Sequence, residues 1–252
     1  MTLPPTNVGV ERGARSQAGK CVWTLRRTSG DNVGQFEKRL LDELPAVVTK
    51  LVPAAAEVYV TLQEQGAYSG ALVDTGMGEH PVDAAVELLT SEDYVRLDDL
   101  HAHLHSMCGH VQGWRVKPTL IFDSTEPRRL GEPSVSPSVL VFVERLDGAT
   151  PEHFSRNWYI HAGHLDGEDA ESEESTAERG REEAEGPDRC YRQNRVIEPI
   201  TPTAWLVHGY TQLQMGFLLP PVGSEPYARA RGEAPFDKWP PRILQGYEYR
   251  VL

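Results

Sequence analysis

The segment HGYTQLQMGF, at positions 208–217, gives the clearest indication of the fold. Two sets of side chains alternate along it. The apolar set consists of Thr211, Leu213, Met215 and Phe217. The polar set consists of His208, Tyr210, Gln212 and Gln214. Because successive residues of a β-strand point to opposite faces, we predict a sheet that packs helices on one face and carries polar groups on the other, either in solvent or around a ligand cavity.

The rest of the chain follows the order strand, helix, strand, strand, helix, strand, written twice. In the first half, strands are expected at 21–25, 57–62, 84–89 and 112–116. In the second half, they are expected at 139–143, 190–197, 204–217 and 245–249. A four-stranded antiparallel sheet with helices on one face leaves its other face to be covered. Two such units in one chain can therefore pair these faces and enclose a barrel-like cavity.

The domain boundaries follow from composition. Residues 1–20 are expected to be a disordered tail, 21–123 a first unit, 124–138 a linker rich in Pro and Ser, and 139–252 a second unit. Residues 166–188 hold 11 acidic and two basic residues, so this segment supplies most of the net charge of −12. A run of this kind buries little apolar surface, and we expect an exposed insertion that is either a solvated loop or a docking surface for a basic partner.

The composition excludes several classes of protein. A hydrophobic content of 39% over 252 residues suits a globular protein, and no apolar run is long enough to span a bilayer. The first 20 residues lack the apolar core of a signal peptide, so a cytoplasmic location is expected. The three widely spaced cysteines suit reduced thiols. The absence of a basic stripe argues against nucleic acid binding, and we expect neither a nucleic acid nor a membrane partner.

Two segments of the second half resemble the EthD family. They are TPEHFSRNWYIHA at 150–162 and RCYRQNRVI at 189–197. The resemblance covers mainly 139–252, while the first half is similar only in layout. It implies an α+β fold of two tandem ferredoxin-like units forming a single-chain dimeric α+β barrel, in which 139–252 is the EthD-like unit and 21–123 a degenerate copy. Three positions depart from the family pattern, since His161 comes one residue early, Gly163 stands where proline is usual, and Arg195 replaces a histidine.

The candidate site combines a helix stripe with the neighbouring strands. Phe154, Trp158 and His161 share one face of a helix, where they can form core or line a cavity. The predicted catalytic residues are His161 as general base, Asn194 to orient the substrate, and Arg195 to stabilise an enolate or phenolate. The predicted ligand-binding residues are Phe154, Trp158, Tyr191, Gln193, His208 and Tyr210.

The resemblance implies a small-molecule enzyme that works without a bound cofactor. The reaction expected is oxidation, dehydration or cyclisation of an aromatic or polyketide-like compound in the barrel cavity. The alternative is a non-catalytic carrier or accessory protein, because an altered histidine pattern is also what a decayed site would show. The expected partners are a small molecule and, as an open option, a second copy that makes a homodimer of pseudo-dimers.

A group of histidines offers one further alternative. His101, His103 and His105 alternate, with His110 and Asp98 nearby, and two or three imidazoles with a carboxylate could bind zinc or iron. No HExxH-like signature accompanies them. We therefore expect a polar helix flank there rather than a metal site.

Overall fold

The computed structural model describes residues 19–64, 82–92, 95–123, 125, 128–161, 190–201, 207–214 and 242–252. The first half contains β1 (Gly19–Arg26), α1 (Val33–Lys38), the π-helical turn η1 (Arg39–Glu43), α2 (Leu44–Leu51), β2 (Ala55–Gln63), β3 (Ala84–Thr90), α4 (Asp98–Met107) and β4 (His110–Asp123). The second half contains β5 (Ser138–Val143), α5 (Pro151–His161), β6 (Cys190–Pro199), β7 (Gly209–Gln214) and β8 (Arg242–Arg250). The acidic segment 166–188 and the segment 220–241 lie outside the described residues.

The strands form a closed barrel in the order β1-β3-β2-β8-β5-β7-β6-β4, and every pairing is antiparallel. The order β4-β1-β3-β2 of the first four strands recurs as β8-β5-β7-β6 in the last four. This closed antiparallel α+β barrel confirms the predicted pairing of two sheets. The finer prediction of two ferredoxin-like units stays open, because the segment between β7 and β8 is outside the described residues.

The strands β4 and β8 join the two sheets, because each pairs with a different sheet along each half of its length. β4 pairs with β1 through residues 110–116 and with β6 through 114–123. β8 pairs with β5 through 242–246 and with β2 through 246–250. One strand of each sheet therefore also pairs with the other sheet. Gly246 is the residue at which the pairing of β8 passes from β5 to β2.

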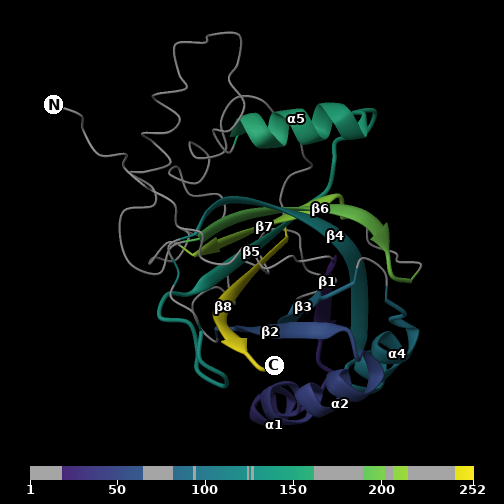
Figure 1. The fold of residues 1–252 in the computed structure, drawn as a ribbon, viewed down its shortest axis with the longest axis vertical. Coiled ribbons are helices and arrows are strands. Elements are labelled where there is room, and N and C mark those ends of the chain that lie inside the picture. Colours follow the sequence, from purple (N-terminus) through teal and green to yellow (C-terminus); the bar gives the residue numbers. More distant parts are fainter. Residues whose placement is uncertain are drawn as a thin grey trace, which may run out of the picture.

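The helices lie outside the barrel, with α1, α2 and α4 on one side and α5 on the opposite side (Figure 1). Trp23 of β1 belongs to one buried cluster with Phe36 of α1, Leu40 of η1 and Leu104 of α4. Pro45 lies in the first turn of α2, where its missing N–H removes no helical hydrogen bond. Because side chains alternate along each strand, one set packs outward against the helices and the other set points into the barrel.

The end of the predicted tail needs correction, because Gly19 and Lys20 belong to β1 and Lys20 is buried. Residues of the predicted linker also contact the barrel: Leu130 and Pro133 form bridges with β8, and the Ser134 N–H donates to the Glu248 carbonyl at 2.7 Å. Local composition did not show these contacts, because each is made with residues more than 60 positions away.

Two further expectations concern the environment of the chain. Within the described ranges, no helix combines the length and apolar character needed to cross a membrane. The three cysteines are buried and free. Burial raises the pKa of Cys21 to about 11 and that of Cys108 to about 12, so both are protonated thiols at neutral pH.

Candidate functional site in the barrel interior

The interior is lined by side chains from both halves of the chain. An apolar cluster that includes Val22, Trp114, Leu140, Tyr210 and Leu244 joins strands of the two sheets. The register also defines a row of cross-strand neighbours that runs from β4 through β1, β3 and β2 to β8. In this order, the row consists of Gln112, Thr24, Ala85, Thr61 and Glu248. Short side chains therefore occupy the middle of one wall. An eight-stranded barrel has an interior that side chains can fill or that can hold one small ligand.

A buried carboxylate on β3 connects the two sheets. Glu87 lies 2.5 Å from the Lys20 ammonium, and the Tyr210 hydroxyl donates to the same carboxylate oxygen at 2.5 Å. The Lys20 nitrogen also lies 5.4 Å from the centre of the Tyr210 ring. All three side chains are buried. One carboxylate thus receives a cation from the first half of the chain and a hydroxyl donor from the second.

A second buried carboxylate lies on β8. The Arg128 guanidinium donates through Nε to Glu248 at 2.7 Å, and Gln212 donates through Nε2 to its other oxygen at 2.6 Å. Arg128 also donates to Gln214 at 2.6 Å. Arg192 donates through Nη1 to Gln212 Oε1 at 3.2 Å. We call the full set the interior cluster, which consists of Lys20, Glu87, Arg128, Arg192, Tyr210, Gln212 and Glu248.

The environments of the two carboxyls move their pKa values in opposite directions. Burial by itself raises the pKa of Glu87, but Lys20, Tyr210 and Arg192 outweigh burial and lower it below the ordinary value. Burial raises the pKa of Glu248, Arg128 offsets only part of this effect, and the charge of Glu87 raises it further. Glu87 is therefore held as a carboxylate, while Glu248 is the group that more readily keeps a proton.

The interior also shifts the pKa values of Tyr210 and Lys20. Burial, and then the neighbouring Glu87 charge, raise the pKa of Tyr210 well above its ordinary value. Burial lowers the pKa of Lys20, against the opposing effect of Glu87. Tyr210 is thus a neutral hydroxyl. The interior holds three cationic side chains, Lys20, Arg128 and Arg192, beside two carboxyls.

Several buried polar atoms of the interior have no hydrogen-bond partner among the described residues. They are Thr24 Oγ1, Thr61 Oγ1, Gln112 Oε1, Ser138 Oγ, Asn194 Oδ1 and Gln214 Nε2. Thr24 and Thr61 are both cross-strand neighbours of Ala85, and Ser138 is opposite Gln214. Leaving such groups unpaired is costly, so water or a polar ligand is their expected partner.

Aromatic rings form the apolar part of the interior. Phe142 stacks on Tyr210 with ring centres 5.3 Å apart, and Trp114 lies 6.3 Å from Phe142. These rings adjoin the Glu87 carboxylate through the Tyr210 hydroxyl. The interior therefore combines an aromatic wall with fixed charges, which is the usual composition of a site for a small organic molecule.

Most of the predicted ligand-binding residues come together on the outer side of the sheet, beneath α5. Phe154 lies 5.3 Å from Trp158 and 6.0 Å from His208, measured between ring centres. Gln193 donates to the Trp158 carbonyl at 3.0 Å and to the Tyr191 hydroxyl at 3.3 Å. These five residues form a packed helix–sheet contact, with Val141 and Val143 of β5 in the same cluster as the two α5 rings.

The remaining predicted residues lie elsewhere. Asn194 is fully buried and donates to the Tyr210 carbonyl at 3.4 Å, and the Tyr210 ring belongs to the interior. Arg195 is exposed at the surface of β6. His161 ends α5, and its side chain is outside the described part of the structure. Among the described side chains, the sheet separates Phe154 and Trp158 of α5 from Tyr210 in the interior. A catalytic role for His161 stays a prediction.

Two of the histidines in the group at 101–110 make polar contacts. His101 Nε2 lies 3.3 Å from the Thr201 hydroxyl, and His110 Nε2 lies 2.7 Å from Gln112 Nε2. Within the ranges that the structure describes, no group of three or more His, Cys, Asp or Glu side chains could hold a metal ion.

Sequence reasoning missed most of the interior cluster, although a signal was present. Glu87 is the one charged residue in the apolar strand AAVELLT at 84–90, and Lys20 immediately precedes the apolar run at 21–23. A charge within a strand buried on both faces needs a partner, so its presence indicates a paired or functional group. Its identity could not be predicted, since Glu87 and Tyr210 are 123 positions apart.

Comparisons with known proteins give structural similarity only. No family model matches the chain, and no curated protein matches it. Among solved structures, the "putative monooxygenase" of Lactobacillus acidophilus NCFM is 9% identical, with a TM-score of 0.43 over 93% of this chain and 94% of that one. A mutant chlorite dismutase from Candidatus Nitrospira defluvii, in complex with cyanide, is 11% identical, with a TM-score of 0.45 over 93% and 92%. The candidate site is therefore defined by this chain's own residues.

Proposed function

We propose that the chain is a small-molecule enzyme that transfers protons within the barrel, with Glu248 as proton donor and Glu87 as proton acceptor. One observation carries this proposal: two fully buried carboxyls line the same interior, and their environments move their pKa values apart. Opposed shifts of this kind are how a protein assigns acid and base roles to two like groups.

The cations of the interior cluster suit the charge that such a reaction develops. Removing a proton next to a carbonyl or from a phenol produces an enolate or phenolate, which a fixed and water-excluded cation stabilises. Arg192 influences both carboxyls, since it lowers the pKa of each. It therefore takes the stabilising role that the sequence assigned to Arg195, which lies at the surface.

The class of substrate follows from the lining. The rings of Trp114, Phe142 and Tyr210 favour an aromatic or polyketide-like compound, and the unpartnered hydroxyls of Thr24 and Thr61 favour one with polar substituents. Dehydration and cyclisation are the reactions of the expected set that proton transfer alone can drive. A role for His161 as general base stays a prediction, as does the descent of both halves from one ferredoxin-like unit.

The test compares binding, turnover and stability in the full-length chain. A panel of hydroxylated one-ring and two-ring aromatic compounds is screened by ligand-observed NMR, and compounds that bind are followed for conversion. Thr61→Val removes an unpartnered hydroxyl, so the free energy of unfolding should change by less than about 1 kcal/mol, while affinity falls about tenfold. Thr211→Val, on the outer face of β7, is the matched control and should leave affinity unchanged.

Glu248→Gln separates catalysis from binding. It keeps the shape of the side chain but carries no transferable proton, so turnover should fall at least about a hundredfold while affinity stays within tenfold. Binding without turnover in the wild-type chain would favour the carrier alternative. Equal affinity in Thr61→Val and wild type would place the ligand outside the barrel.

A further inference from the structure

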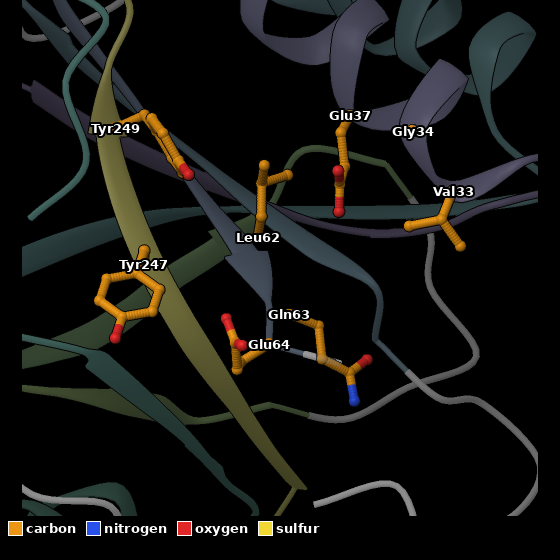
Figure 2. Close-up of a pocket in the computed structure, with 8 residues that line it drawn as sticks. All are labelled: Val33, Gly34, Glu37, Leu62, Gln63, Glu64, Tyr247 and Tyr249. Carbon is orange, nitrogen blue, oxygen red and sulfur yellow. The ribbon is translucent and has the colours of Figure 1, made fainter. Parts of the chain in front are cut away.

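A pocket of about 480 Å³ opens between α1 and the paired ends of β2 and β8. Its described lining consists of Val33, Gly34, Glu37, Leu62, Gln63, Glu64, Tyr247 and Tyr249. Glu37 projects from α1 and Tyr249 from β8, on opposite sides of Leu62, while Glu64 lies near Tyr247 (Figure 2). This pocket is on the helix side of the sheet and is separate from the interior cluster.

Among its described lining residues, the pocket carries negative charge without a matching cation. Neither Glu37 nor Glu64 forms an ion pair with another described residue. The charge of Arg27 acts to lower the pKa of Glu37. Arg27 itself forms an ion pair with Asp83 at 3.1 Å and donates to the Asp31 carbonyl at 3.2 Å. Burial raises the pKa of Glu37, and the Glu64 carboxylate raises it further. A positive charge placed between the two carboxylates would relieve this repulsion.

Two tyrosine rings add a second feature that suits a cation. Tyr249 is partly buried and lines the same pocket as Glu37 and Glu64. Burial and the charges of these two carboxylates raise its pKa, so it stays a neutral phenol. The face of an aromatic ring attracts an ammonium group electrostatically. Val33 and Leu62 supply apolar surface between the charged groups.

We propose that this pocket binds a small organic cation, namely a protonated amine with an apolar body, between the Glu37 and Glu64 carboxylates and the rings of Tyr247 and Tyr249. The ammonium group lies between the carboxylates, and the apolar body contacts Leu62 and Val33. The site is separate from the proposed catalytic interior, and it carries no assigned role in that reaction.

The test uses isothermal titration calorimetry of the full chain with three probes of similar shape but different charge. The probes are 2-phenylethylammonium, 2-phenylethanol and 3-phenylpropanoate. The cation should bind at least tenfold more tightly than the alcohol, and the anion should not bind. Glu37→Gln should weaken binding of the cation about tenfold, which corresponds to one charge-assisted hydrogen bond. Glu43→Gln removes the same charge from an exposed position of η1 outside the pocket, and affinity should stay within twofold.

Variants of Tyr247 test the role of the ring. Tyr247→Phe keeps the aromatic face and should retain affinity within twofold, whereas Tyr247→Ala should weaken binding several-fold. Circular dichroism confirms that each variant is folded. The proposal is overturned if the alcohol binds as tightly as the cation, if the cation does not bind at millimolar concentration, or if Glu37→Gln and Glu43→Gln have equal effects.

Discussion

Glu87→Ala is expected to lower the free energy of unfolding by about 3–5 kcal/mol, because it leaves the Lys20 ammonium buried without a counter-charge. The Lys20 and Glu87 side chains are 1% and 3% exposed, so water cannot replace the lost partner. The Tyr210 hydroxyl loses its acceptor in the same variant. Urea unfolding of the full chain at neutral pH measures the effect.

The triple variant Lys20→Met, Glu87→Leu, Tyr210→Phe removes all three polar partners together. Buried ion pairs can often be replaced by apolar groups without loss, so this variant should recover most of the stability that Glu87→Ala loses. Glu132→Ala is the control, since its 3.7 Å pair with Arg129 is exposed and should contribute no more than about 0.5 kcal/mol. A change in Glu87→Ala as small as in this control would mean that Lys20 is neutral or solvated.

The effect of Glu87→Ala should also depend on pH in a defined direction. The pKa of Glu87 is lower in the folded chain than its ordinary value. Its contribution to stability is therefore present above the ordinary pKa and is lost as the pH falls through the folded value. The difference between wild type and Glu87→Ala should narrow in acid.

Gly246→Ala is expected to destabilise the chain by about 3 kcal/mol or more, because it forces apart the seam between β2 and β8. A Cβ atom at this position would lie 1.5 Å from the Leu62 carbonyl oxygen and 2.6 Å from its carbonyl carbon. Both are backbone atoms, so no side-chain rotation relieves the clash. Gly246 is also the residue at which β8 passes from β5 to β2, so the displacement affects barrel closure.

Gly34→Ala is the matched control for this substitution. Gly34 lies in α1, and a Cβ atom there would meet only Asn32 Oδ1, at 3.4 Å. Its stability should stay equal or rise slightly, through the higher helix propensity of alanine. Hydrogen exchange should show faster opening of the β2–β8 amides in Gly246→Ala alone. Wild-type stability in that variant would show that the two strands are less closely paired than described.

The fold was predictable because its signals are local. The alternation at 208–217 placed His208, Tyr210, Gln212 and Gln214 on one side of the strand. The structure confirms that Tyr210, Gln212 and Gln214 line the barrel. His208 precedes β7 and contacts Phe154 of α5 instead. The apolar run at 139–143 likewise became the strand β5. The helix at 36–48 is interrupted by the π-helical turn η1, which ends two residues before Pro45. The missing N–H and the ring of a proline disturb the preceding helical turn, so this irregularity also has a local signal.

The site was less predictable because its members are distant in sequence. Lys20, Glu87 and Tyr210 come from the first, third and seventh strands, and only barrel closure joins them. The motif at 150–162 predicts a site beside α5, but Phe154 and Trp158 pack on the outer side of the sheet. A helix stripe identifies the face that packs, but it does not identify what lies on the far side of the sheet.

The most direct test of the proposed acid–base pair is a pH titration of the full chain by carbon-13 NMR, with the glutamate carboxyl carbons labelled. Glu87→Gln and Glu248→Gln each remove one signal and so assign the two groups. Glu248 is expected to titrate above the ordinary range of glutamate and Glu87 below it. Titration of both groups within the ordinary range, or in the reverse order, would contradict the assignment of Glu248 as proton donor and Glu87 as acceptor.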